Sequence, residues 1–121
     1  MRFPLKPKKW AYLKGQWGEK IAARYLQLKG YSLLESRLKT PFGEIDLIMR
    51  KGSFIVAVEV KTRATYEEAA FSLSSFQMRR IQQALLFYIK RYPSPLDLRF
   101  DVILISSWMW PKHIRGAWVP N

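Results

Sequence analysis

Three carboxylates stand in the most apolar stretch of a strongly basic chain. The stretch is GEIDLIMRKGSFIVAVEVKTR, residues 43–63, and its acids are Glu44, Asp46 and Glu59. The chain has nine Asp and Glu against 21 Lys and Arg, so acids are scarce and this segment concentrates them. Carboxylate oxygens are the ligands that Mg²⁺ prefers, and one or two suffice where a substrate phosphate supplies more. The segment is therefore a candidate site for a divalent cation.

The register of two predicted strands decides how these acids meet. Side chains alternate between the two faces of a strand, so the faces that carry Asp46 and Glu59 can be matched. If Arg50 and Ser53 flank a two-residue turn, Asp46 lies opposite Ala57 and diagonal to Glu59. A loop longer by two residues places Asp46 directly opposite Glu59. Both registers bring the acids together, and only a one-residue slip separates them.

Lys61 follows Glu59 by two residues and shares its face of the strand. A cation held by the acids would polarise a phosphodiester and lower the pKa of a bound water, and Lys61 could hold that water or stabilise the developing charge. Without a cation, adjacent carboxylates repel and one takes up a proton at a raised pKa. Glu19 borders the apolar face of a preceding helix and can approach the same patch.

The competing interpretation is an ordinary outward sheet face. Carboxylates that pair with Lys or Arg across neighbouring strands are common, and each pair contributes only about 0.2–1 kcal/mol. A single Glu-x-Lys also occurs by chance in many chains. Spacing alone therefore leaves both interpretations open.

Hydrophobic periodicity predicts the elements that position these residues. Helices are expected over about residues 16–29 and 75–91, and strands over 31–38, 44–50, 54–62 and 98–106, with a short last strand over 114–119 left open. The segment 64–74 is expected to be irregular. The order α-β-β-β-α-β, with or without a final strand, predicts an α/β (α+β) fold with helices packed against a mixed sheet. Residues 1–14 are expected to form a basic, loosely ordered arm, and residues 15–121 a single domain.

Composition excludes several kinds of site. The 121 residues include no Cys and one His, which excludes disulfides, zinc–thiolate sites and a His-rich metal site. The longest apolar runs, Phe54–Val58 and Val102–Ile105, are too short to span a membrane. The N-terminal residues lack the apolar core and cleavage site of a signal peptide, so a cytoplasmic protein is expected.

The charge indicates the partner. A formal net charge of +12 attracts polyanions. A membrane-surface protein would gather this charge on one amphipathic helix, whereas here Lys and Arg are scattered along the chain. Nucleic acid is therefore the expected partner, and no membrane association is expected.

Two hexapeptides carry a family resemblance. GEIDLI (Gly43–Ile48) and VEVKTR (Val58–Arg63) follow a helix with Gly18-Glu19, and Arg99–Val102 starts a later strand. This combination resembles the YraN-like family, which is similar to archaeal Holliday-junction resolvases and to the restriction-endonuclease-like superfamily with its PD-(D/E)xK signature. The resemblance covers about residues 15–105 and implies a restriction-endonuclease-like sandwich.

The resemblance also implies roles for single residues. Asp46, Glu59 and the backbone carbonyl of Val60 would be metal ligands for Mg²⁺, with Mn²⁺ as a substitute. Lys61 would be the catalytic lysine and Glu19 the helix-borne acid that completes the site. In the signature, Ile replaces Pro before Asp46, and a glycine that commonly follows Lys-Thr-Arg is missing.

Two functions follow from this resemblance. One is a Mg²⁺-dependent endonuclease acting on DNA, including branched DNA, with a homodimer as the form that would make two symmetric cuts. The other is a non-catalytic nucleic-acid-binding protein that keeps the fold and the charge. The candidate nucleic-acid contacts are Lys14, Arg63, Gln77, Arg79 and Arg80.

Residues near the C-terminus are expected to be structural. Trp108 and Trp110 are expected to close the core rather than to stack on bases. His113 is expected to be a tail residue rather than a ligand, because no second His or Cys accompanies it. Asp101 is expected to be a structural acid or the partner of a basic residue.

Overall fold

The structure, a computed structural model, describes residues 7–106 and 110–120, with side chains from residue 16 onward. The side chains of Lys14 and Trp108 therefore lie outside the described residues. The helices are α1 (Pro7–Leu28), α2 (Tyr66–Phe71) and α3 (Ser75–Arg91). The strands are β1 (Ser32–Thr40), β2 (Gly43–Lys51), β3 (Phe54–Thr62), β4 (Asp97–Ile105) and β5 (Lys112–Ile114).

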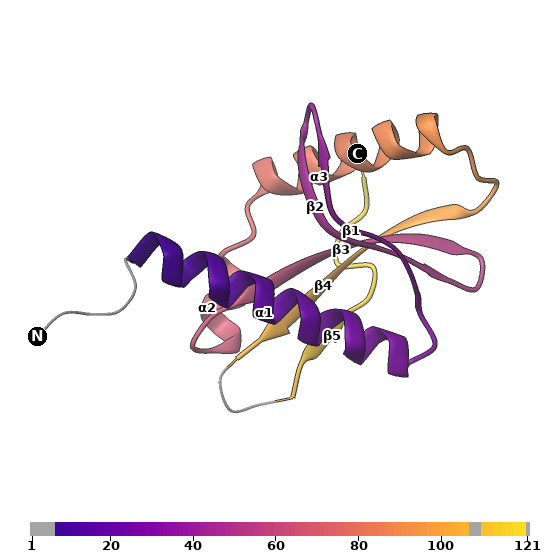
Figure 1. Cartoon of the computed structure of the whole chain (residues 1–121). Coiled ribbons are helices and arrows are strands. Elements are labelled where there is room, and N and C mark those ends of the chain that lie inside the picture. The colour runs from indigo at the N-terminus through magenta and orange to yellow at the C-terminus, as the bar shows by residue number, and fades with distance from the viewer. Residues whose placement is uncertain (1–6, 107–109, 121) are drawn as a thin grey trace, which may run out of the picture.

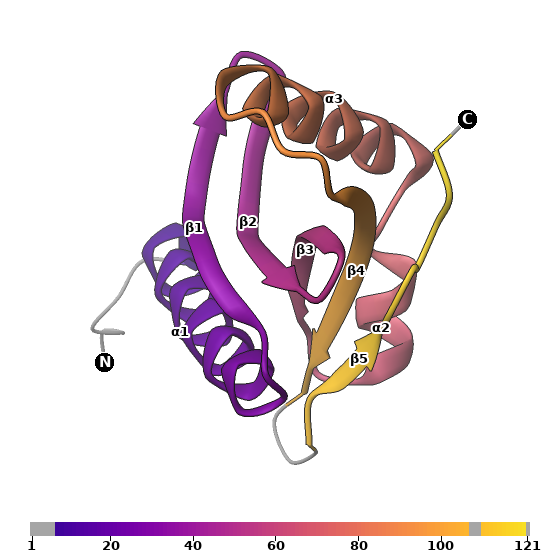
Figure 2. The ribbon, with the colours of Figure 1, turned by 90° about the vertical axis from the view of Figure 1, so that its right-hand side faces the viewer.

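The strands form one mixed sheet in the order β1-β2-β3-β4-β5. Only β3 and β4 run parallel; the other neighbours are antiparallel. Helix α1 covers one face, whereas α2 and α3 cover the other (Figures 1 and 2). This arrangement confirms the expected mixed α/β sandwich, and it is compatible with a nuclease-like one.

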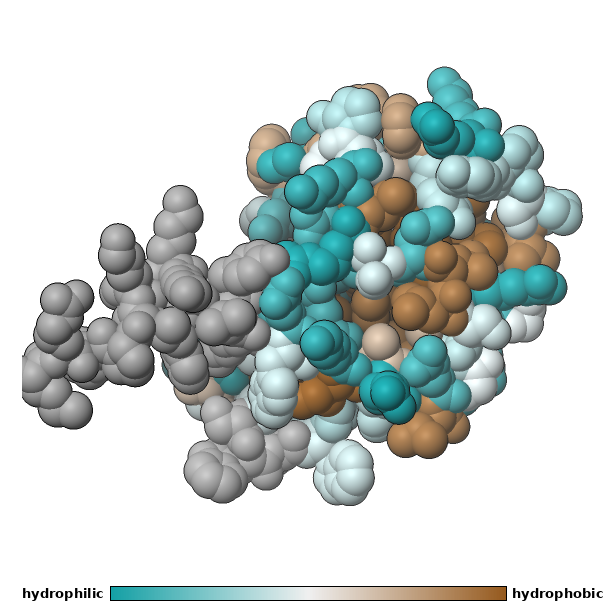
Figure 3. Space-filling view, in the orientation of Figure 1, coloured by the Kyte–Doolittle hydropathy of each residue, from teal (hydrophilic) through white to brown (hydrophobic). Residues whose placement is uncertain are grey.

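Strand alternation divides the core into two layers. Leu47, Met49 and Val58 pack with Ala22 and Leu26 of α1. Their neighbours along the strands, which include Ile48 and Ala57, pack with Ile81, Ala84 and Leu85 of α3. Apolar residues also reach the surface over β1, where Leu33 and Leu34 are each 39% exposed; Figure 3 shows apolar surface on this side, bordered by hydrophilic residues.

Two segments differ from the sequence prediction. Helix α1 begins at Pro7, so residues 7–14, which were expected to be a loosely ordered arm, are helical. Proline is compatible with the first turn of a helix, because the N–H that it lacks has no intrahelical partner there. The segment 64–74, which was expected to be irregular, contains α2, and its N-cap Thr65 accepts a hydrogen bond from the Glu68 N–H.

Strands β1 to β4 and helix α3 follow their predicted boundaries closely, whereas the short last strand, expected over residues 114–119, is β5 at Lys112–Ile114. β3 and α3 have the predicted bounds, and Gly30 follows α1 with a φ of 91°, the left-handed region that glycine favours. Helix α3 begins with a capping box in which Ser74 and Gln77 satisfy each other's backbone N–H groups. No helix in the described part of the chain is both long and apolar enough to cross a membrane.

Candidate metal and nucleic-acid site

Strands β2 and β3 separate at the predicted site. They pair from Lys51↔Phe54 only as far as Leu47↔Val58, whereas β3 continues to pair with β4 up to Thr62. In Figure 1 the β1–β2 hairpin rises away from β3 and ends beside α3. This divergence separates the two strands, and we call the place where they part the fork. The fork begins directly beyond the Leu47↔Val58 pair.

Asp46 is the first residue of β2 beyond the paired segment. The hairpin register, extended by one step, sets it directly opposite Glu59, which is the second of the two registers considered from the sequence. Ile45 and Leu47 pack in opposite core layers although they are two residues apart, so β2 twists at Asp46. The Asp46 carboxylate accepts a 2.8 Å hydrogen bond from the Val60 N–H, which would otherwise lack a strand partner at the fork.

Asp46 and Glu59 form a close acid pair. Burial, repulsion by the Glu59 carboxylate and a hydrogen bond between the two carboxyl groups raise the pKa of Asp46 to about 8. The Val60 N–H and the Lys61 ammonium act in the opposite direction but are outweighed. Near neutral pH the pair therefore retains a proton, which a bound cation would displace.

Lys61 lies beside this pair. Its Nζ is 3.2 Å from Glu59 Oε2 and 3.4 Å from Gln77 Oε1, and its side chain is only 10% exposed. Gln77 belongs to the capping box of α3, so the helix start and the lysine are tied together. The structure thus brings Asp46, Glu59, Lys61 and the weaker candidate Gln77 to one place.

Glu19 approaches the fork from α1 because Gly18 allows the helix to lie close to β3. A Cβ atom at Gly18 would collide with the hydroxyl of Thr62. Burial raises the pKa of Glu19 to about 7, with further contributions from Asp46 and Glu44 that are partly offset by Arg37. Glu19 is thus within electrostatic reach of Asp46, as the sequence analysis expected.

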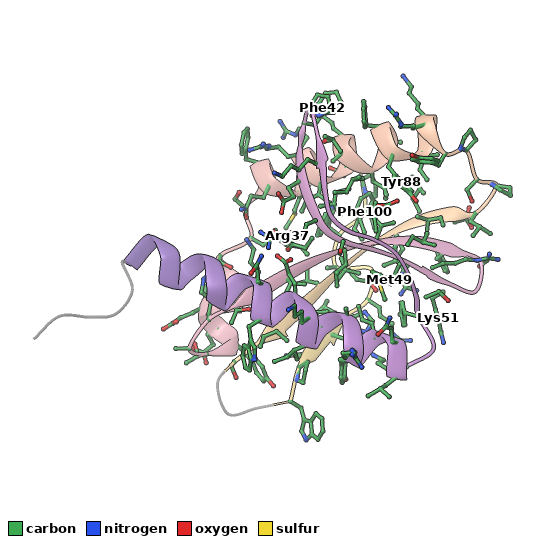
Figure 4. The ribbon with its side chains drawn as sticks, in the orientation of Figure 1. Arg37, Phe42, Met49, Lys51, Tyr88 and Phe100 are labelled. Carbon is green, nitrogen blue, oxygen red and sulfur yellow. The ribbon has the colours of Figure 1, made fainter. Side chains whose placement is uncertain are left out.

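Arg37 is a site residue that the sequence analysis missed. Its Nε lies 3.6 Å from Glu19 Oε1 and 3.6 Å from Glu44 Oε1, and Figure 4 shows it at the fork, above α1. Its φ of 53° marks a distortion of β1 opposite Asp46. No periodic pattern in the sequence signals this residue, because its position depends on that distortion.

The donor set suits a hard cation that keeps several waters. Among the residues that the structure describes, no three Asp, Glu or His side chains converge closely enough to hold a metal ion alone. Asp46 and Glu59 supply two neighbouring carboxyl groups, which is the small protein contribution that Mg²⁺ accepts when water and phosphate complete its octahedron. The Val60 carbonyl as a third ligand stays a prediction.

Two of the predicted nucleic-acid contacts, Gln77 and Arg80, lie at the fork. Arg63, Arg79 and Arg80 are solvent-exposed, and Arg80 Nε donates a 2.8 Å hydrogen bond to the Phe42 carbonyl at the hairpin tip. A small pocket of about 130 Å³ is lined by Gly43, Glu44, Glu59, Gln77, Arg80 and Ile81. Basic side chains and the acid pair thus occupy the same region.

Two expectations about the C-terminal region are wrong. Trp110 is 82% exposed and does not close the core, because it precedes β5 outside the packed layers. His113 is not a tail residue: it belongs to β5, its side chain is 2% exposed, and its Nε2 lies 2.7 Å from Asp101 Oδ2. Asp101 is a structural acid, as expected, and it also receives two hydrogen bonds from Arg99.

Comparisons with known proteins agree with one another. The family model described as "Uncharacterised protein family UPF0102" matches residues 18–105. A UPF0102 protein of Parvibaculum lavamentivorans is 46% identical over 91% of this chain and 84% of its own length. UPF0102 proteins of Maricaulis maris and a Chelativorans species are 43% and 44% identical over 92% and 89% of this chain, and over 89% of each relative. The matched segment contains Glu19, the fork and α3, and the chain belongs to the UPF0102, or YraN-like, family.

Proposed function

We propose that this protein is a metal-dependent endonuclease that hydrolyses phosphodiester bonds in DNA, and that it belongs to the restriction-endonuclease-like superfamily. The observation that carries the proposal is the acid pair of Asp46 and Glu59, partly buried at the fork and adjacent to Lys61. A buried acid pair destabilises the fold when both groups ionise. Its presence in a chain with so few acids is explained if a divalent cation binds there.

Mg²⁺ held at these carboxylates would stabilise charge on the phosphodiester and acidify an attacking water. The chain itself supplies position and charge. The Val60 N–H fixes the Asp46 carboxylate, and Glu59 and Gln77 hold the Lys61 ammonium in place. From that position Lys61 can orient water or stabilise negative charge on phosphate. Glu19 and Arg37 lie on the α1 side of the fork. There the Arg37 guanidinium partly offsets the negative charge of Glu19.

DNA is the proposed partner because the chain carries a net charge of +12 and exposes arginines around the fork. The proposal includes Mg²⁺ as the cofactor, with Mn²⁺ as a substitute, and a cytoplasmic homodimer. Substrates with branches are included, since two symmetric cuts in a four-way junction suit a two-fold dimer.

A cleavage assay tests the proposal. Linear, flapped and four-way DNAs are incubated with wild-type protein in Mg²⁺ and in Mn²⁺, alongside Asp46→Asn and Lys61→Ala. Both variants should lose at least about 100-fold in cleavage rate, the scale expected when a group that stabilises transition-state charge is removed. Asp97→Asn, which changes an exposed acid at the start of β4, is the matched control and should cleave normally. Wild-type protein that leaves every substrate intact would refute the catalytic proposal.

A second function is favoured by a specific observation. Lys61 already lies 3.2 Å from Glu59, and Arg37 lies 3.6 Å from Glu19 and Glu44, so much of the acidic charge has a partner within the chain. A non-catalytic nucleic-acid-binding protein could keep such a network. It would bind DNA without metal-dependent cleavage, and Asp46→Asn would change affinity no more than any other removal of one negative charge.

A further inference from the structure

An exposed aromatic ring lies at the edge of the site. Phe76 is 65% exposed and occupies the first turn of α3, directly before Gln77, which contacts Lys61. A single exposed apolar side chain is ordinary on a protein surface. This one is unusual in its surroundings, because it is one residue from a group that touches the proposed catalytic lysine.

Arg80 fixes the arrangement around this ring. Its guanidinium carbon lies 5.7 Å from the centre of the Phe76 ring, one helical turn further along α3 on the same side. Its Nε donates to the Phe42 carbonyl, and Phe42 packs edge-on against Phe87 at the hairpin tip labelled in Figure 4. Arg80 is therefore held at two points and covers part of the Phe76 ring, while most of Phe76 faces solvent.

The same arginine links the ring to the acid pair. Arg80 lines the 130 Å³ pocket together with Glu59 and Gln77. A polynucleotide with a phosphate at Glu59 and Lys61 would thus have its neighbouring base close to Phe76. In a duplex, bases are already stacked on one another, and their faces are inaccessible to a side chain. An unpaired base can stack on an aromatic ring, and a nearby guanidinium adds to this interaction.

We propose that Phe76, backed by Arg80, stacks on an unpaired base next to the phosphate bound at Glu59 and Lys61. The preferred substrate is then nucleic acid with unpaired bases beside the scissile bond, as in flaps, tails and junction openings. This inference rests on the proposed function for the location of the phosphate, but stacking itself is measured without cleavage.

The test compares two DNAs in EDTA, where metal-dependent cleavage is prevented. One is a blunt linear duplex; the other is the same duplex with a single-stranded tail that carries a fluorescent adenine analogue. Phe76→Ala should weaken binding to the tailed DNA roughly tenfold, as expected when a stacking aromatic is removed, and should abolish quenching of the analogue. Binding to the blunt duplex should be unchanged.

Two further variants keep the result interpretable. Phe76→Leu retains an apolar side chain without a π face and should lose the quenching as Phe76→Ala does. Leu86→Ala removes another exposed apolar residue of α3, 55% exposed, and should bind both DNAs like the wild type. Equal losses on both DNAs, full binding by Phe76→Ala, or wild-type quenching by Phe76→Leu would each overturn the inference.

A cleavage assay with the Asp46 and Phe76 variants distinguishes failure of this inference from failure of the proposed function. Cleavage that requires Asp46 but ignores Phe76 would support the nuclease and overturn the stacking role. Tail-specific loss of binding in Phe76→Ala, in a protein that cuts no DNA, would support stacking and overturn the nuclease.

Discussion

Two acids in the sheet, Asp101 and Asp46, have opposite surroundings. Asp101 is fully buried on β4 and accepts hydrogen bonds from Arg99 Nε at 2.9 Å, Arg99 Nη2 at 2.8 Å and the Gly116 N–H at 3.0 Å. His113 Nε2 adds a contact of 2.7 Å. Burial alone would raise the pKa of Asp101, but the hydrogen bonds from His113, Arg99 and Gly116 outweigh it and hold the pKa below its ordinary value.

Asp46 receives much less compensation. It accepts one backbone hydrogen bond, from Val60. The charged group that affects its pKa most is a second carboxylate, Glu59, which repels it. Its pKa is raised to about 8. Each acid lies on a strand next to an edge of the same sheet, Asp46 on β2 and Asp101 on β4, so the difference comes from their partners. The chain contains the donors to stabilise a buried carboxylate, and at the fork it uses few of them. Asp101 therefore has the surroundings of a structural acid, whereas Asp46 has those that the proposed function expects of a cation ligand.

Removal of the structural acid should have the largest effect on stability. Asp101→Ala would leave Arg99 and the nearly buried His113 without their shared partner. The free energy of unfolding should fall by about 4 kcal/mol, the scale for breaking one side of a buried charge pair. Asp97→Ala, an exposed position on the same strand, should change it by less than about 0.5 kcal/mol in urea unfolding. Comparable effects at the two positions would mean that the Asp101 network contributes little.

Asp46→Asn should have the opposite effect and raise the free energy of unfolding. Because the folded-state pKa of Asp46 is raised, the folded protein holds a proton that the unfolded chain has released. The associated stability is present at acid pH and is lost as the pH rises from 3.8 to about 8. Asparagine does not titrate, so in EDTA at pH 8 the variant should be more stable than wild type by several kcal/mol, with about 5 kcal/mol as the upper bound for this rise in pKa.

The check on this prediction is urea unfolding from pH 5 to pH 8. The advantage of Asp46→Asn should shrink toward acid pH. Asp97→Asn, which changes an exposed acid outside the site, is the control and should not reproduce this pH dependence. An advantage that is constant with pH would show that repulsion at the fork is not its cause.

Gly18→Ala should have a smaller effect on stability, and it should destabilise the protein although alanine usually stabilises a helix. Alanine normally stabilises a helix relative to glycine by roughly 0.5–1 kcal/mol. Here its Cβ would collide with the Thr62 hydroxyl, so either the Thr62 side chain must rotate or α1 must shift away from β3 and carry Glu19 with it. We expect a loss of about 2 kcal/mol, as for an overpacked core position, measured by thermal unfolding. A stabilised variant would show that the close approach of α1 is not required.

The sequence predicted the elements with strong local signals. β3 and α3 have unbroken periodicity and clear ends, and their predicted bounds match the structure. The start of α2 also had a signal that was overlooked: Thr65 is followed three residues later by Glu68, the pattern of an N-cap. Elements without such signals, such as the helical residues 7–14, were assigned wrongly.

Side-chain partners across distant segments were harder to predict. Asp46, Glu59, Lys61 and Glu19 could be found because the motif places them on neighbouring strands and a helix face. The contact of His113 with Asp101 depends on how β5 pairs with β4, and β5 is only three residues long. The position of Arg37 depends on a single left-handed residue in β1. Neither feature leaves a periodic trace in the sequence.

Cation binding at the fork is the most direct test of the contrast between the two acids. Mn²⁺ is titrated into the wild-type protein at pH 8 and the thermal midpoint is followed, because a ligand that binds only the folded state raises stability as its concentration exceeds its dissociation constant. We predict a midpoint that rises with Mn²⁺ for the wild type and for Asp97→Asn, and one that stays constant for Asp46→Asn. A wild-type midpoint that does not respond to Mn²⁺ or Mg²⁺, or an equal response in Asp46→Asn, would contradict the assignment of Asp46 as the functional acid.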